Sequence, residues 1–326
     1  MTPKTKKICL LIAGGTILSE KDQAKVEKNS DIQTWLEKMP ELSIVAEIEP
    51  VFIIGENNDF SGKELWQKII KEIYERLDSF AGFIVTSRVN NIIYNALAVS
   101  FAMVNLNKTV IFTGSQLPVI NKESILLKKT FGGLGIKANL INAIQIATME
   151  LPVVGLMFGN SFIRAVKAVR STVYALNIFS SVDNTYLAKI DFGISPQEKV
   201  KLPTSKPELK NNFASEVLVI KYYPGFNLDL IKDSLKQSKG LFIEGLAIQT
   251  LNKKFIEDLK SLKIPVVVYN NFFIEDLKTK NIIEVSKMTK ETALVKFMWV
   301  LGQTKDLVKI KELMLEERCA EFIHHK

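Results

Sequence analysis

A glycine pair followed by a threonine, Gly14-Gly15-Thr16, is the first stretch whose residue types and order could support chemistry. It follows an apolar run at residues 8–13, which is typical of a strand buried on both faces of a parallel sheet. Because glycine allows a sharp turn, the Thr16 hydroxyl would lie at the carboxyl end of that strand, where open α/β sheets bind ligands. The alternative is an ordinary tight turn in which Thr16 is only a cap.

Histidine is nearly absent, and this limits the possible chemistry. His324 and His325 are the only two and stand at the end of the chain, which argues against a Ser-His-Asp triad, a Cys-His pair or a histidine-ligated metal. The cysteines, Cys9 and Cys319, support no disulfide framework, and Cys9 falls inside the first apolar run, as expected of a core residue. We therefore expect no metal and no cofactor, and chemistry carried by Thr, Ser, Lys, Arg, Tyr or carboxylates.

The composition indicates a globular protein with a large core. The chain has 326 residues, of which 47% are hydrophobic, and a formal net charge of +8. Its lysines are interleaved with Glu and Asp, a pattern of solvated surfaces, so we expect no nucleic-acid partner. No apolar run is long enough to span a membrane, and the run at residues 8–13 is too short for a signal peptide. We expect a cytoplasmic protein without a membrane partner.

Strand and helix patterns alternate along the first half of the chain. Predicted strands cover residues 8–13, 43–54, 82–86, 108–113 and 152–158. Predicted helices cover residues 32–39, ended by Pro40, and residues 62–77, 92–105 and 136–148. Residues 18–31 are expected to form a polar loop. The β-α-β order predicts an α/β fold whose mostly parallel sheet has helices on both faces.

A second, smaller α/β domain is expected after a proline-rich polar stretch at residues 193–215. Its predicted strands cover residues 216–223, 240–246 and 264–269, and its predicted helices cover residues 228–236, 253–262, 288–301 and 305–317. The resulting division is an N-terminal domain at residues 1–204, which bears the site, a linker at 205–214 and a C-terminal domain at 215–326.

Several separated segments now resemble the L-asparaginase family, of the threonine amidohydrolase and bacterial cytoplasmic type. The segments are Ala13-Gly14-Gly15-Thr16-Ile17, residues 82–86 with the polar pentad after them, residues 108–118, Asn139-Leu-Ile-Asn-Ala143, Tyr223-Pro224-Gly225, and Met288-Thr-Lys-Glu-Thr292 with Lys296. Together they cover nearly the whole chain, so the resemblance implies a two-domain asparaginase-like fold. It also implies a chemistry without histidine, in which Thr16 attacks a side-chain amide and a second Thr, supported by an Asp-Lys pair, activates it.

The resemblance fails at the residues that would carry this chemistry. The pentad that should read His-Gly-Thr-Asp-Thr is Ser87-Arg88-Val89-Asn90-Asn91. Val89 has no hydroxyl in place of the second Thr, and Asn90 has no negative charge for an α-ammonium group. Arg170 replaces the Lys, and arginine does not deprotonate to act as a base.

The predicted site therefore has one retained catalytic residue, Thr16, and a set of altered pocket residues. The pocket residues are Gly15, Asn58, Asp59, Ser87, Arg88, Val89, Asn90 and Arg170. Asn57-Asn58 stands where the family has Asp-Ser for the substrate carboxylate, and the N-terminal loop lacks the expected Tyr, since the first is Tyr74.

Three functions are compatible with this pattern. The first is a family member that has lost L-asparagine amidohydrolase activity and binds a different small ligand or acts structurally in an oligomer. The second is an amidohydrolase with a rearranged mechanism and an altered substrate, in which Thr16 acts with Ser87 or Lys167. The third is the amidotransferase subunit that shares this fold and acts on charged tRNA, although it depends on the same missing groups.

Two further expectations concern partners. Arg88 and Arg170 replace neutral or titratable groups while the carboxylate at Asn90 is lost, so the pocket should prefer an anionic ligand without an α-ammonium group. The alternative is that the arginines pair with Glu56 or Asp59 and close the pocket. The family builds its site between subunits, so we also expect a homo-oligomer, a dimer or tetramer.

Overall fold

The computed structural model describes residues 5–14, 36–37, 40–53, 62–114, 136–171, 177–191, 193–245, 253–270 and 279–324. They belong to two compact units, Met1–Asn211 and Asn212–Lys326. Thr16 and the polar stretch at residues 18–31 lie outside the described residues. Among the described helices, none combines the length and the apolar character that a membrane span requires.

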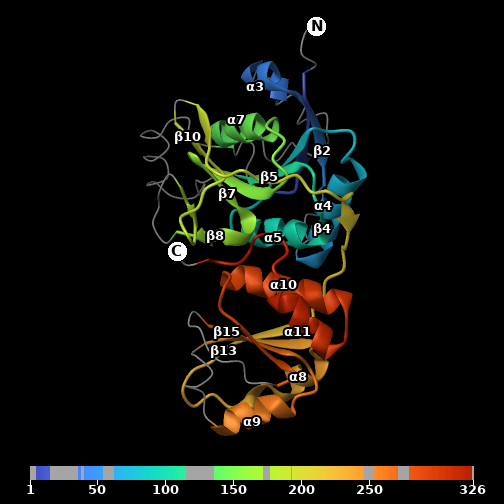
Figure 1. The fold of residues 1–326 in the computed structure, drawn as a ribbon, viewed down its shortest axis with the longest axis vertical. Coiled ribbons are helices and arrows are strands. Elements are labelled where there is room, and N and C mark those ends of the chain that lie inside the picture. The colour runs from blue at the N-terminus through green and yellow to red at the C-terminus, as the bar shows by residue number, and fades with distance from the viewer. Residues whose placement is uncertain are drawn as a thin grey trace. The chain divides into compact units, whose positions relative to one another are not determined.

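The first unit is built on an eight-stranded, mostly parallel sheet with the order β11-β10-β7-β6-β5-β3-β1-β2 (Figure 1). Its parallel strands are β1 (Lys7–Ile12), β2 (Glu47–Phe52), β3 (Gly82–Thr86), β5 (Thr109–Thr113) and β6 (Val154–Phe158). The antiparallel strands are β7 (Ser161–Arg164), β10 (Ala188–Ile190) and β11 (Ile194–Pro196). The predicted fold class is confirmed, and the antiparallel strands extend one side of the sheet.

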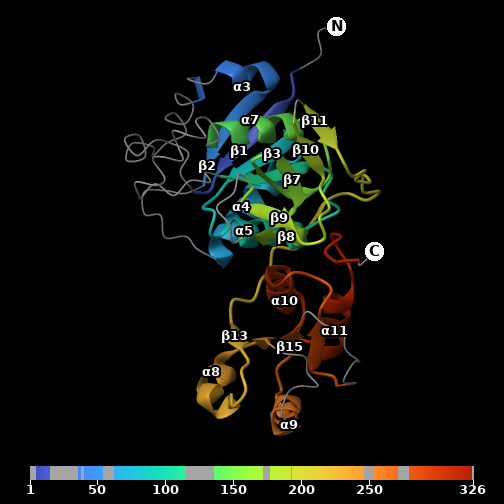
Figure 2. The same cartoon turned by 90° about the vertical axis from the view of Figure 1, so that its left-hand side faces the viewer.

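Helices cover both faces of this sheet (Figure 2). The helices are α3 (Pro40–Val45), α4 (Lys63–Glu75), α5 (Ile92–Ala102) and α7 (Ile136–Ala147). Alternate side chains of β1, such as Leu10, pack with Leu140 and Ala143 of α7 and Leu42 of α3 in one core. Because both faces are covered, β3 and β5 are buried along their whole length.

The prediction for residues 40–46 is wrong. Pro40 begins α3 instead of ending a helix, and residues 43–45, predicted as the start of a strand, are helical. Proline suits a first helical position, because its nitrogen has no hydrogen to leave unpaired there. The strand β2 begins only at Glu47. Of the helix predicted at residues 32–39, only residues 36–37 are described, and they are helical.

Short strands between residues 161 and 209 were not predicted, because pieces of two to four residues show no clear alternation. Besides β7, β10 and β11, two small ribbons occur here. One pairs β8 (Ala168–Arg170) with β9 (Phe179–Ser181). The other pairs β12 (Glu208–Leu209) with β4 (Met103–Val104), so the helix predicted at residues 92–105 ends earlier, at Ala102. β12 lies within residues 205–214, the predicted linker, and the unit boundary at Asn211 falls inside the same span.

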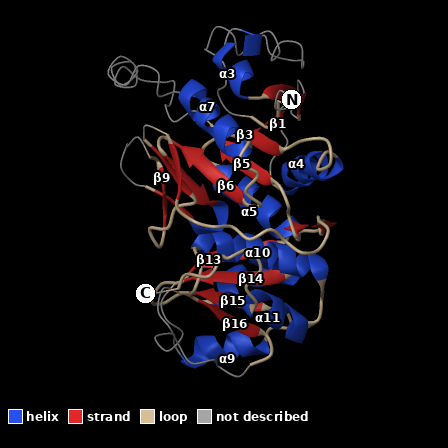
Figure 3. Cartoon of the chain, turned by 45° about the horizontal axis from the view of Figure 1, so that its top comes forward, coloured by secondary structure: helices blue, strands red, loops and turns tan. Residues whose placement is uncertain are grey.

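The second unit contains a four-stranded parallel sheet in the order β13-β14-β15-β16 (Figure 3). The strands are β13 (Val217–Lys221), β14 (Gly240–Glu244), β15 (Val266–Tyr269) and β16 (Ile282–Val285), of which only β16 was not predicted. The helices are α8 (Lys232–Gln237), preceded by a 3-10 turn, α9 (Lys253–Ser261), α10 (Lys290–Gln303) and α11 (Leu307–Leu315). Thr289 caps α10 by accepting a hydrogen bond from the Thr292 amide.

Candidate functional site

Three central strands of the first unit end at the same level. Ile12 of β1 is in register with Thr86 of β3, and Thr86 with Thr113 of β5. The ladder continues past the strand ends, because the Ala13 amide donates to the Thr86 carbonyl at 3.0 Å and the Ser87 amide to the Thr113 carbonyl at 3.1 Å. The predicted site residues that follow β3 are therefore held at the carboxyl edge of the sheet. Gly15, Thr16, Asn58 and Asp59 lie outside the described residues.

A close backbone contact fixes the position of Gly114, the residue that follows β5. A Cβ atom on Gly114 would come within 2.6 Å of the Ser87 carbonyl oxygen, so only glycine fits there. The buried Asn139 side chain of α7 completes the arrangement, donating to the Gly114 carbonyl and accepting from the Gly159 amide, both at 3.0 Å. The sequence placed Asn139 in a family-like motif but gave no role for it.

Ser87 ends a buried hydrogen-bond relay. The Trp66 Nε1 group donates to Asn95 Oδ1 at 2.9 Å, and Asn95 Nδ2 donates to Ser87 Oγ at 2.7 Å. The direction is fixed, because an indole nitrogen can only donate and thereby orients the Asn95 amide. The described members of the relay include no carboxylate, histidine or lysine, so it supplies no base to Ser87. Trp66 and Asn95 were not among the predicted site residues.

Two predicted site residues are brought into contact across the edge of the sheet. Arg170 Nη1, at the end of β8, donates to Asn90 Oδ1 in the turn after β3 at 3.0 Å. Both side chains belong to exposed residues, and so does Arg88, whereas Val89 is partly buried. Within the described part of the chain, neither Arg88 nor Arg170 forms an ion pair. Whether Glu56 or Asp59 pairs with them lies outside the described residues.

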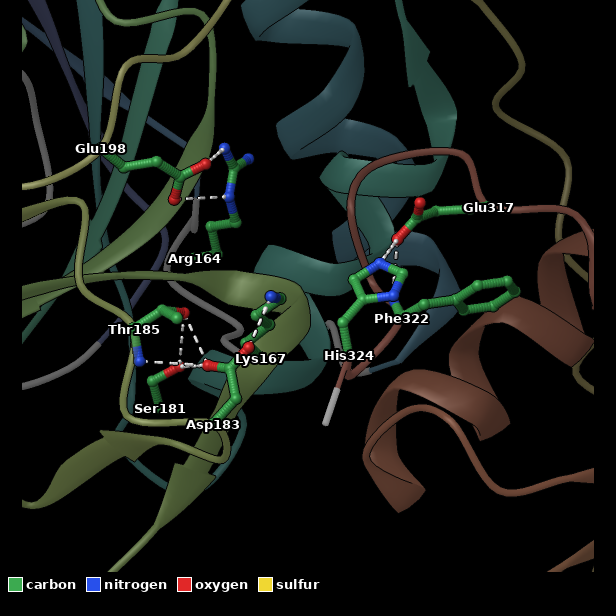
Figure 4. Close-up of polar contacts among 9 residues, drawn as sticks. All are labelled: Arg164, Lys167, Ser181, Asp183, Thr185, Glu198, Glu317, Phe322 and His324. Carbon is green, nitrogen blue, oxygen red and sulfur yellow. Dashed lines mark hydrogen bonds and ion pairs between the residues drawn. The ribbon is translucent and has the colours of Figure 1, made fainter. Parts of the chain in front are cut away.

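The strand that carries Arg170 is anchored by a charged cluster (Figure 4). Lys167 Nζ lies 2.6 Å from Asp183 Oδ2, and both side chains are only about one-tenth exposed. Asp183 Oδ1 also accepts from Ser181 Oγ at 2.8 Å and from the Thr185 amide and hydroxyl at 3.1 and 2.6 Å. Burial alone would raise the pKa of Asp183, but the hydrogen bonds from Lys167, Thr185 and Ser181 outweigh it and lower the pKa below its usual range. Lys167 is thus committed to a carboxylate rather than presented as a free amine.

Neighbouring charges in the same region are paired as well. Arg164 of β7 binds the Glu198 carboxylate through Nε and Nη2 (Figure 4). Such a fork-to-carboxylate contact fixes geometry, and the Arg164 side chain is largely buried. Arg164 therefore has a structural role at β7. Among the described arginines of this region, Arg88 and Arg170 are the two that have no described carboxylate partner.

Cys9 takes no part in the site. It is fully buried in β1, as predicted, and burial raises the pKa of its thiol to about 12. A protonated thiol is neither a nucleophile nor a metal ligand at neutral pH. Across the described ranges, no three side chains of His, Cys, Asp or Glu gather as a metal site would require.

In a comparison with known proteins, each of the two units matches a protein-family model. Residues 7–202 match the family model "Asparaginase, N-terminal", and residues 216–314 match "Glutaminase/Asparaginase C-terminal domain". L-asparaginase 1 of Escherichia coli is 25% identical, over 97% of this chain and 98% of that protein. One of the subunits of the glutamyl-tRNA(Gln) amidotransferase of Sulfolobus acidocaldarius is also 25% identical, over 98% of this chain and 76% of that protein.

Solved structures have the same fold. L-asparaginase I of Vibrio cholerae superposes with a TM-score of 0.81 at 23% identity, covering 98% of this chain and all of that one. The thermostable L-asparaginase of Thermococcus kodakarensis gives a TM-score of 0.79 at 22% identity, with coverage of 98% and 100%. With both units matched in chain order and the fold shared from end to end, this chain belongs to the asparaginase family.

Proposed function

We propose that this protein has lost L-asparagine amidohydrolase activity and binds a different small anionic ligand at the carboxyl edge of its larger sheet. The hydrogen bond between Arg170 and Asn90 is the observation that carries the proposal. By the family resemblance, these positions should hold a lysine and a substrate-binding carboxylate. Here an amide faces a guanidinium, so the pair offers neither an amine that could act as a base nor a negative charge for an α-ammonium group.

The charge of the edge supports an anionic ligand. Arg170 uses one nitrogen on Asn90, which leaves further N–H donors of its guanidinium, and Arg88 is exposed beside Asn90 in the same turn. A planar guanidinium binds carboxylate or phosphate through two parallel hydrogen bonds. No described carboxylate neutralises either arginine. A ligand with carboxylate oxygens and without an α-ammonium group fits this arrangement best.

The test has an enzymatic and a binding arm. Ammonia release from L-asparagine and L-glutamine should be absent or very low. In a catalytic set that acts as a unit, losing several members lowers the rate about as much as losing the whole set. Turnover at about 1 per second or faster, the ordinary enzymatic range, would contradict the proposal. In the binding arm, titration calorimetry should show succinate binding more tightly than L-aspartate, which differs from it only by the α-ammonium group. Equal or reversed affinities would contradict the anionic-ligand part.

Family membership supports a second candidate function. In it, the protein is an amidohydrolase with a rearranged mechanism, and Thr16 is the nucleophile. Relatives named as L-asparaginases and as amidotransferase subunits favour it. The engagement of Lys167 with Asp183 and the absence of a described base next to Ser87 weigh against the helpers considered for it. Ammonia release that disappears in Thr16→Ala would establish this second function.

We also infer a homo-oligomer, at least a dimer, since the family builds its site from two subunits. The Thr289 cap and the Tyr223-Pro224-Gly225 turn retain the family-like framework of the second unit. Light scattering at micromolar concentration should give at least twice the mass of one chain, and a single-chain mass would contradict the inference. A cytoplasmic location is inferred too, in line with a structural neighbour, a probable cytoplasmic L-asparaginase from Campylobacter jejuni (TM-score 0.74, 18% identity).

A further inference from the structure

The turn that carries Asn90 is supported from the interior by three buried polar side chains. Trp66 of α4, Asn95 of α5 and Ser87, which directly follows β3, are 5%, 2% and 1% exposed. We propose that this relay is a positioning device, which holds the turn so that Asn90 meets Arg170. The inference rests on the proposed function only in assigning Asn90 and Arg170 to a ligand site.

The relay closes the turn across its base. Ser87 begins the turn and is tied to β5 through its amide, while the Asn91 amide donates to the Arg88 carbonyl at 3.0 Å. The Asn95 amide donates to the Asn91 carbonyl at 3.0 Å in the first turn of α5. The Asn95 side chain then crosses back to the Ser87 hydroxyl at 2.7 Å. Asn91, the N-cap of α5, makes no side-chain capping bond to this helix, so the relay supplies the side-chain link across this turn.

The partner of Asn90 is anchored independently. Arg170 ends β8, which pairs with β9 and is fixed by the contact between Lys167 and Asp183. The Val182 amide donates to the Lys167 carbonyl at 2.9 Å and continues the same ribbon. Two interior anchors thus hold two surface groups at hydrogen-bond distance. Loosening the relay should free Asn90 from Arg170 without touching β8.

The side chain of Arg170 can be followed directly by NMR in protein labelled with 15N-arginine, because the chain has only five arginines. Assignment uses Arg170→Lys, and Asn90→Ala defines the signals of the released guanidinium. In Ser87→Ala, rotation of the Arg170 guanidinium about Cζ–Nε should become about fivefold faster, the factor that corresponds to roughly 1 kcal/mol for one hydrogen bond. Ser100→Ala is the matched control, because Ser100 lies on the same α5 but bonds the Ala96 carbonyl at 2.8 Å.

Two features separate positioning from general loss of structure. The signals of Arg164, which is bonded to Glu198, serve as an internal reference and should stay unchanged. Asn95→Asp should keep slow rotation at Arg170, because Ser87 can donate to the new carboxylate, whereas Asn95→Leu should release it. The proposal is overturned if Ser87→Ala and Asn95→Leu leave Arg170 as in the unaltered protein, or if Asn90→Ala does not release it. No ligand is needed, so this result is independent of the succinate titration.

Discussion

Each unit contains one described lysine–carboxylate pair whose side chains are largely buried, and these two pairs differ in the degree of burial and in their surroundings. In the second unit, Lys296 of α10 lies 2.7 Å from Glu321, and both side chains are completely buried. In the first unit, Lys167 and Asp183 retain about one-tenth of their side-chain exposure. The Lys296 ammonium also donates to the Glu316 carbonyl at 2.5 Å, and the Glu321 carboxylate accepts from backbone amides of the same C-terminal segment.

The difference shows which charges serve structure and which remain available. Glu321 and Lys296 satisfy each other inside the second unit and hold residues 316–322 against α10. Lys167 and Asp183 hold β8, the strand that delivers Arg170 to the surface. Arg170 itself faces only an amide, so its charge is not compensated within the described part of the chain. The structural charges are thus those paired with an opposite charge, and the candidate ligand-binding charges, Arg170 and Arg88, have no described carboxylate partner.

The largest effect is expected from breaking the buried pair of the second unit. Glu321→Gln should lower the free energy of unfolding by about 3–5 kcal/mol, because it leaves the Lys296 ammonium buried without a counter-charge. The measurement is urea unfolding at pH 7. Replacing both residues, as Lys296→Met with Glu321→Leu, should cost clearly less than the sum of the single changes. Additive losses would contradict the assignment as a coupled pair.

A smaller loss is expected at the corresponding pair of the first unit. Asp183→Asn should lower the free energy of unfolding by about 1–3 kcal/mol, since hydrogen bonds to a charged group are lost at a partly exposed site. Asp233→Asn is a matched control: it carries the same change in an exposed i,i+3 pair with Lys236, where we expect less than about 1 kcal/mol. Equal effects at the two sites would show that the buried cluster has no special role.

Acidification should weaken both structural pairs. Burial opposes ionisation of Glu321, but Lys296 and the amides of Cys319 and Arg318 outweigh it, so its pKa is lowered; the pKa of Asp183 is lowered as well. A carboxyl group with a lowered folded-state pKa stabilises the fold above its unfolded pKa, about 4, and this contribution is lost as the pH falls further. Urea unfolding from pH 7 to 3 should show this decline, and it should be shallower in Asp183→Asn. An unchanged slope in that variant would show that Asp183 does not contribute to the pH dependence of stability.

The smallest effect on stability is expected at Arg170, where the same substitution should strongly weaken ligand binding. Arg170→Gln should change the free energy of unfolding by no more than about 0.5 kcal/mol, because the side chain is exposed. The same change should weaken succinate binding by about tenfold or more, since a charge-assisted contact is worth about 1.5–3 kcal/mol. Calorimetry on the two proteins provides the comparison. A stability loss as large as that of Asp183→Asn would instead make Arg170 a structural charge.

The central elements were predictable because they depend on local composition. Strands buried on both faces need continuous apolar runs, and residues 82–86 show one that the structure reproduces as β3. The turn after it was predicted as part of the site because its residues follow such a strand. β8 and β9 were not predicted, since three residues carry too little pattern. The helix at Pro40–Val45 was missed because its apolar and polar residues also fit a strand.

By itself, the sequence determined the fold class, the family resemblance and the replacement of the expected catalytic groups by Val89, Asn90 and Arg170. Tertiary structure alone decided which polar groups meet. Asn90 and Arg170 are 80 residues apart, and Trp66 and Asn95 are 29 apart, so no local pattern signals either contact. Nor does any pattern reveal that Lys296 is fully buried, because lysine is ordinarily exposed and its burial depends on a partner far along the chain. Periodicity in the sequence indicates which side of an element is apolar. Hydrogen bonds between distant residues depend on how the elements pack against one another.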